Sequence, residues 1–126
     1  MQHLSFSVMP LALPLAILFA GISVGQSKNP GDLAGNAESG KAVFVKNGCY
    51  QCHGYQGQGG FAGARLMQTK LSQTGFIGFV RNPPPGGMPQ FRAKIMPDQE
   101  LADVYAYIKS IPEPKPVKDI PLLNGL

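Results

Sequence analysis

The chain has 126 residues, which is enough for one domain but not for two. Its 2 cysteines exclude four-cysteine zinc and iron–sulfur sites, because no further thiolates are available. The formal net charge of +4 is modest, which argues against a nucleic-acid-binding footprint and predicts weak steering toward acidic partners.

The chain opens with an apolar stretch. Residues 8–24 carry no charged side chain, and residues 1–25 are therefore predicted to be an export signal. Small residues at positions 23–25 favour cleavage before Gln26. The stretch is also close in length to a short transmembrane helix, so a membrane anchor retained through residues 8–24 is the competing interpretation. Either outcome places the rest of the chain outside the cytoplasm.

The segment over residues 26–36 is polar and contains glycine and proline, so it is predicted to be a linker. Asn36 is a suitable helix N-cap, and Glu38 falls in the first turn of a helix that runs to about Asn47. Gly48 is expected to end this helix.

The next five residues form the most informative motif. Cys49, Tyr50, Gln51, Cys52 and His53 spell C-x-x-C-H, the pattern of covalent haem attachment in c-type cytochromes. Two thiols at this spacing can reach the two vinyl groups of a porphyrin and form thioethers. The imidazole that follows then lies beneath the iron as an axial ligand. Thiol–disulfide chemistry is the competing interpretation of the two cysteines.

Two further helices are predicted after this motif. A glycine-rich turn at residues 54–60 leads toward a helix over about Ser72–Arg81, and the last helix covers Asp98–Ser110. Between these helices, residues 83–89 contain 4 prolines, which predict a stiff loop that presents Met88.

The last helix is followed by prolines at three alternate positions, which predict an extended tail over residues 113–126. No strand pair and no internal repeat is visible in the sequence. The predicted fold class is therefore all-α, with three to five helices joined by long loops over residues 37–112.

A pure electron carrier places a strong ligand on the second face of the iron, and a thioether suits this role. The chain after residue 25 has three methionines and no histidine besides His53. Met88 lies in the proline-bracketed loop, which can place a side chain at a small ordering cost. Met67 and Met96 are more simply explained as core packing. Met88 is therefore the predicted distal ligand.

Together these motifs resemble a class I c-type cytochrome over nearly all of residues 37–112. The layout is most similar to that of small exported bacterial monohaem cytochromes. The shared motifs, in the family's order, are Gly40-x-x-x-Phe44, the run Cys49–Gly54, the run Gly86–Phe91 and the run Leu101–Ile108.

The resemblance implies a cytochrome c fold wrapped around one covalently bound haem c. It also implies that the first and last helices cross where Gly40 allows a close approach, with Phe44 against an aromatic side chain of the last helix, Tyr107. The sequence departs from the family at Pro97, where a serine or threonine cap usually begins the last helix.

For the site, the resemblance implies thioether bonds from Cys49 and Cys52, with His53 as the proximal ligand and Met88 as the distal ligand. A backbone carbonyl usually accepts a hydrogen bond from the second imidazole nitrogen in this family. In this sequence Ala64 stands at that position, where the family has proline.

Arg81 is the predicted partner of a haem propionate, since a guanidinium suits carboxylates. A solvated arginine at a helix end is the alternative interpretation.

The implied function is one-electron transfer in the periplasm, with no enzymatic turnover by this chain. The implied partners are redox proteins such as a dehydrogenase, an oxidase or a quinol–cytochrome c reductase, and nucleic acid is not among them. The nearest alternative is a cytochrome subunit or dedicated electron acceptor of a periplasmic dehydrogenase. A gas-binding or peroxidatic haem protein and a thiol–disulfide oxidoreductase are the more distant ones.

Overall fold

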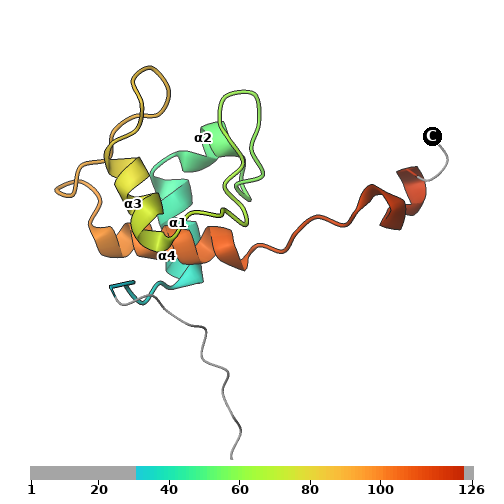
Figure 1. The fold of residues 1–126 in the computed structure, drawn as a ribbon, viewed down its shortest axis with the longest axis horizontal. Helices are drawn as coiled ribbons and strands as arrows, with labels where there is room; N and C mark the ends of the chain where they lie inside the picture. Colours follow the sequence, from blue (N-terminus) through green and yellow to red (C-terminus); the bar gives the residue numbers. More distant parts are fainter. Residues whose placement is uncertain (1–30, 124–126) are drawn as a thin grey trace, which may run out of the picture.

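Four α-helices make up most of the regular structure in residues 31–123, the part of the chain that this computed structural model describes (Figure 1). No strand occurs within these residues, so the predicted all-α fold class is confirmed. The helices are α1 (Ala37–Lys46), α2 (Cys49–His53), α3 (Gln73–Arg81) and α4 (Asp98–Ser110), followed by the 3₁₀ turns η1 (Val117–Asp119) and η2 (Pro121–Leu123).

The predicted export signal, residues 1–25, lies outside the described residues, as does the first part of the predicted linker. Among the helices of residues 31–123, none has the length and apolar character that crossing a membrane requires.

Side-chain caps explain where two of the helices begin. The Asn36 side chain accepts a hydrogen bond from the Ser39 backbone N–H at 2.9 Å, as predicted for the start of α1. Ser72 caps α3 in the same way through the Gly75 N–H at 3.1 Å. At α4, Pro97 provides no side-chain cap, and Asp98 begins the first turn.

Helices α1 and α4 cross in close contact and carry the core of the domain (Figure 1). A Cβ added at Gly40 would overlap the backbone carbonyl of Asp103, so the two backbones approach more closely than any side chain would allow. One turn further along α1, the fully buried Phe44 meets Tyr107 with ring centroids 5.6 Å apart and planes inclined by 60°. The crossing implied by the family resemblance is therefore present.

The described part of the predicted linker, residues 31–36, is bonded to the helices. The buried Gln73 side chain accepts from the Leu33 N–H at 2.6 Å and donates to the Leu33 carbonyl at 2.9 Å. The Asn36 N–H donates to Asp103 Oδ1 at 2.8 Å. Through these hydrogen bonds, residues 31–36 are attached to both α3 and α4.

The chain after α4 leaves the domain. Residues 112–119 are exposed, and the tail reaches away from the helices as far as residue 123, the last that the structure describes (Figure 1). Two 3₁₀ turns interrupt the extended conformation that its prolines predict.

We predict that Gly40→Ala lowers the free energy of unfolding by about 3 kcal/mol, because the new methyl group meets backbone that cannot rotate away. Gly78→Ala in α3 is the matched control, since a Cβ there meets nothing within 4 Å. The control should raise stability by about 0.5–1 kcal/mol through helix propensity. Denaturant unfolding of both variants measures the difference, and equal stabilities would contradict the close crossing.

Candidate functional site

Helix α2 is one short turn that holds both thiols and the imidazole of the motif. It follows α1 directly, because Gly48 adopts a left-handed conformation (φ 72°) and turns the chain. Gly54, at φ 75°, ends the turn, and its N–H donates to the Tyr50 carbonyl at 2.9 Å. Cys49 is half-buried, whereas Cys52 is exposed. Sequence reasoning did not predict this helix, since five residues are too few for a periodic pattern.

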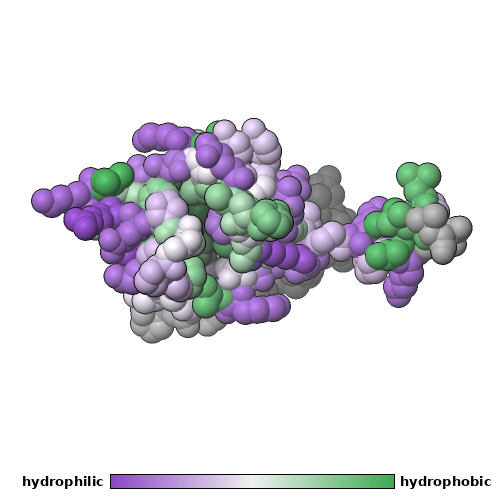
Figure 2. All heavy atoms as spheres, turned by 90° about the horizontal axis from the view of Figure 1, so that it is seen from above, coloured by the Kyte–Doolittle hydropathy of each residue, from purple (hydrophilic) through white to green (hydrophobic). Residues whose placement is uncertain are grey.

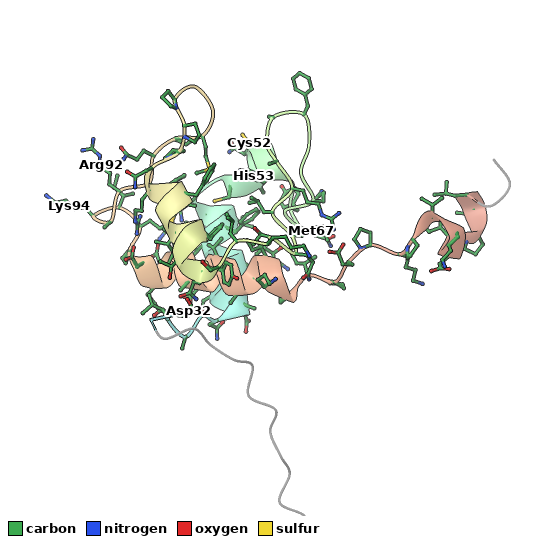
Figure 3. The ribbon with its side chains drawn as sticks, in the orientation of Figure 1. Asp32, Cys52, His53, Met67, Arg92 and Lys94 are labelled. Atoms are coloured by element: carbon green, nitrogen blue, oxygen red, sulfur yellow. The ribbon has the colours of Figure 1, made fainter. Side chains whose placement is uncertain are left out.

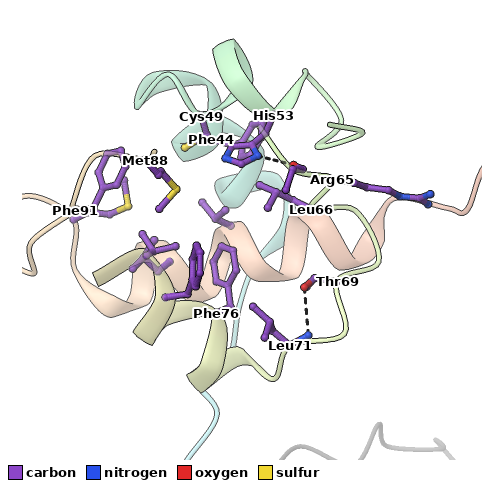
Figure 4. A pocket seen from close by; sticks show the side chains of 16 residues that line it. Phe44, Cys49, His53, Arg65, Leu66, Thr69, Leu71, Phe76, Met88 and Phe91 are labelled. Carbon is purple, nitrogen blue, oxygen red and sulfur yellow. Dashed lines mark hydrogen bonds between the residues drawn. The ribbon is translucent and has the colours of Figure 1, made fainter. Parts of the chain in front are cut away.

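The His53 ring is held by a backbone carbonyl from the following loop. Its Nδ1 lies 2.7 Å from the Ala64 carbonyl oxygen (Figure 4). A carbonyl oxygen can only accept, so Nδ1 carries the proton. In the neutral ring, Nε2 is then left with a free lone pair, the form in which imidazole binds a metal. The carbonyl that the resemblance assigned to Ala64 makes this bond without a proline at that position.

Gly63 makes this contact sterically possible. A Cβ at Gly63 would lie 2.7 Å from the Cys52 carbonyl oxygen and 2.9 Å from His53 Nδ1. The Gly59 N–H also donates to the His53 carbonyl at 2.8 Å, which fixes the start of the same loop. Two glycines outside the motif therefore hold the loop against α2.

An apolar inner cavity of about 220 Å³ lies between α2, α3 and α4 (Figure 4). His53, Arg65 and Thr69 are its polar lining residues. Its wall is otherwise apolar and includes Phe44, Leu66, Phe76, Val80, Met88, Phe91, Met96, Leu101 and Val104. Apolar side chains of α1, α3 and α4 that form the buried core thus also form the wall of this cavity.

An outer cavity of about 510 Å³ adjoins it and opens to the surface. Cys49, His53 and Met88 line both cavities, and Cys52 lines the outer one. Its other walls include the proline loop at residues 83–85. None of the described residues that line the outer cavity is Asp, Glu, Lys or Arg. Figure 2 shows apolar side chains around a hollow on this side of the molecule.

Met88 and His53 reach into the inner cavity from two sides (Figure 4). Met67 is buried in the core, with 7% of its surface exposed, and does not line either cavity. Met96 is fully packed at 1% exposure and belongs to the cavity wall. Met67 and Met96 both belong to the buried core, in agreement with the packing predicted for them, and the choice of Met88 as the ligand stays a prediction.

Arg81 lines neither cavity. Its guanidinium donates to the carbonyls of Phe91 and Met96, both at 2.6 Å, and forms an ion pair with Asp98 at 2.5 Å. The predicted pairing with a haem propionate stays a prediction, and these contacts point to a different use of the side chain.

Burial raises the pKa of the Cys49 thiol above its ordinary value, and a backbone hydrogen bond offsets this only in part. A reactive cysteine has the opposite property, since its thiolate is stabilised at neutral pH. Cys49 is therefore poorly suited to act as a free nucleophile.

His53 and Met88 offer too few ligands for a bare metal ion, so they fit a metal that already carries other ligands. No group of three or more His, Cys, Asp or Glu side chains that could hold a metal ion occurs in the described residues. One imidazole nitrogen and one thioether sulfur provide two ligands, whereas a bare zinc site takes four. Cys49 lines the apolar cavity into which both donors reach, and Cys52 lines the adjoining outer cavity, an arrangement that suits a flat macrocycle that carries its metal.

A comparison with known protein families gives a match. The family model described as "Cytochrome C oxidase, cbb3-type, subunit III" matches residues 35–108, which is more than half of the chain. No curated protein and no solved structure matches the chain.

We predict that Gly63→Ala breaks the hydrogen bond between His53 and Ala64, because the added methyl group displaces the loop from α2. The unfolding free energy should fall by about 1–3 kcal/mol, and the His53 Nδ1 proton should exchange faster in NMR spectra. Gly60→Ala is the control, since a Cβ there meets only the Cys52 carbonyl oxygen at 3.7 Å. An unchanged Nδ1 proton in Gly63→Ala would contradict this account.

Proposed function

Because the chain belongs to the cytochrome c oxidase, cbb3-type, subunit III family, whose matched region is a c-type cytochrome domain, we propose that it carries single electrons between redox partners. Proteins with this domain bind haem c covalently, and the motif at Cys49, Cys52 and His53 fits that attachment. The observation that carries the proposal is that His53 and Met88 line one apolar cavity beside Cys49.

We assign each residue a role in holding the cofactor. Cys49 and Cys52 would hold it through thioether bonds, His53 would bind the iron through Nε2, and Met88 would bind it through its sulfur. Haem supplies reversible one-electron chemistry when bound. Ala64 orients the imidazole and makes it a better donor by accepting from Nδ1. The apolar wall excludes water from the site, which tunes the reduction potential.

A carrier role is favoured over enzymatic turnover. If His53 and Met88 both bind the iron, a substrate would have to displace one of these side chains to reach it. A gas-binding or peroxidatic protein keeps one position open, so Met88 in the cavity wall speaks against that alternative.

A thiol–disulfide function has little support. The described residues contain no strand, whereas a thioredoxin-like protein combines strands with helices. Burial also raises the pKa of Cys49, the first cysteine of the motif. In redox-active Cys-x-x-Cys motifs a lowered thiol pKa favours reaction.

We propose that the protein acts in the periplasm, exported by its first 25 residues or held at the membrane through residues 8–24. The family's name refers to a subunit of an oxidase, which supports a redox complex as the partner. The second candidate is therefore a cytochrome subunit of such a complex, whether of an oxidase or of a periplasmic dehydrogenase. Co-purification of the native protein with a redox enzyme would favour a subunit over a free carrier.

We predict that the purified protein, once denatured, has no titratable thiol and keeps its haem through extraction with acidified solvent. Replacing both Cys49 and Cys52 by serine should release the haem, while Gln51→Ala, at an exposed position within the motif, should retain it. Thiol titration and visible spectra measure both outcomes. Two free thiols in the wild-type protein would revive the thiol–disulfide interpretation.

We predict that Met88→Ala lowers the reduction potential by about 0.1 V, a part of the roughly 0.8 V that axial ligands can span. A thioether raises the potential, so its loss acts in this direction. The ferrous variant should also bind carbon monoxide readily at neutral pH. Redox titration and visible spectra provide both readouts.

The matched control is Met67→Leu, which changes a buried methionine outside both cavities. Its potential and its carbon monoxide binding should equal those of the wild type. If Met88→Ala keeps the wild-type ligation, the distal ligand is another residue and the assignment is wrong.

A further inference from the structure

The loop that carries Met88 has little to hold its tip in place. Residues 82–97 contain no helix. At Gly86 and Gly87 an added Cβ would meet nothing within 4 Å, so the tip has no close neighbour. Met88 itself is half-buried and packs against the core, so its position is set by this packing together with contacts at the base of the loop.

The base of this loop is closed by Arg81. Its Nη1 donates to the Phe91 carbonyl at 2.6 Å, and its Nη2 donates to the Met96 carbonyl at 2.6 Å. Nε and Nη2 also bind Asp98 Oδ1, at 3.2 and 2.5 Å. Only 15% of the Arg81 side chain is exposed, against 57% of the Asp98 side chain, so the bonds to the two carbonyls are better protected from water than the ion pair. One side chain thus joins the end of α3 to the start of α4 and to the part of the loop that follows Met88.

The same contacts reach the wall of the inner cavity. Phe91 follows Met88 by three residues, and both side chains line the cavity. Besides the Arg81 bond, the base is closed by the Phe91 N–H and the Val80 carbonyl at 3.4 Å, a long hydrogen bond. Arg81 therefore provides the shorter links between α3 and the segment that follows Met88.

We propose that Arg81 is a positioning residue for Met88, holding the distal loop so that its thioether stays directed into the cavity. This inference rests on the proposed function, in which Met88 is an iron ligand. Arginine suits the role because a planar guanidinium can donate to several acceptors in fixed directions, which a lysine ammonium does not reproduce. A propionate partner would compete for these same donors.

The test is an imidazole titration of the ferric, haem-loaded protein. Imidazole must displace Met88 to bind the iron, so its apparent affinity reports how firmly the loop holds the thioether. Arg81→Gln should raise the apparent affinity at least tenfold, which corresponds to about 1.4 kcal/mol. Arg81→Lys should raise it nearly as much, because charge alone does not restore the bonds. Asp98→Asn should give a smaller rise of about threefold.

Arg92→Gln is the matched control. Arg92 lies in the same loop and carries the same charge, but its side chain points into solvent with Lys94 (Figure 3). Its imidazole affinity should stay within about twofold of the wild type. Amide hydrogen exchange of residues 82–97 provides a second readout, and it should accelerate in Arg81→Gln but not in Arg92→Gln.

The possible failures are distinguishable. One failure concerns Arg81 alone: Arg81→Lys and Asp98→Asn bind imidazole as the wild type does, and Met88→Ala binds it much more tightly. The positioning role is then wrong, and Met88 stands as the proposed ligand. If Met88→Ala and the wild type bind imidazole alike, Met88 is not the ligand and the proposed function itself needs revision. Should Arg81→Gln fail to fold, the lysine and Asp98→Asn variants decide the matter.

Discussion

The contact between α1 and α4 is the constraint on which the rest of the structure depends. Gly40 lets the backbones of α1 and α4 touch. One turn further along α1, the contact between Phe44 and Tyr107 fixes the angle at which the two helices cross. Helix α2 follows α1 after two residues, Asn47 and Gly48, so the crossing also decides where the motif lies. The thiols and the imidazole therefore reach the cavity because of a helix contact that involves none of them.

Part of the core of the domain also forms the wall of the inner cavity. Side chains such as Phe76, Val80, Leu101 and Val104 are buried, yet they also line the inner cavity. A protein of this size has little apolar area to spare, so a macrocycle in the cavity would complete its packing. A covalently held macrocycle would add to stability through the apolar contacts that it makes only in the folded chain.

Signals from neighbouring residues in the sequence predicted three of the four helices. The site was harder to predict, because it depends on contacts between residues that are far apart in the sequence. Asn36 revealed α1 through its cap, and apolar spacing revealed α3 and α4. Neither the role of Gly63 nor the bonds of Arg81 could be read from the sequence, because both depend on segments brought together only by folding. The family resemblance indicated the Ala64 carbonyl, a contact that composition and spacing alone do not reveal.

The two proposed iron ligands are held in different ways. His53 belongs to the same short helix as both thiols, and a backbone carbonyl fixes its ring at 2.7 Å. Met88 lies on a loop without regular structure, whose base is closed mainly through one arginine. A ligand within one turn of its covalent attachments loses little entropy on binding, whereas a loop ligand must be ordered by other contacts. The distal side is therefore where substitutions outside the cavity can change ligation while haem attachment is preserved.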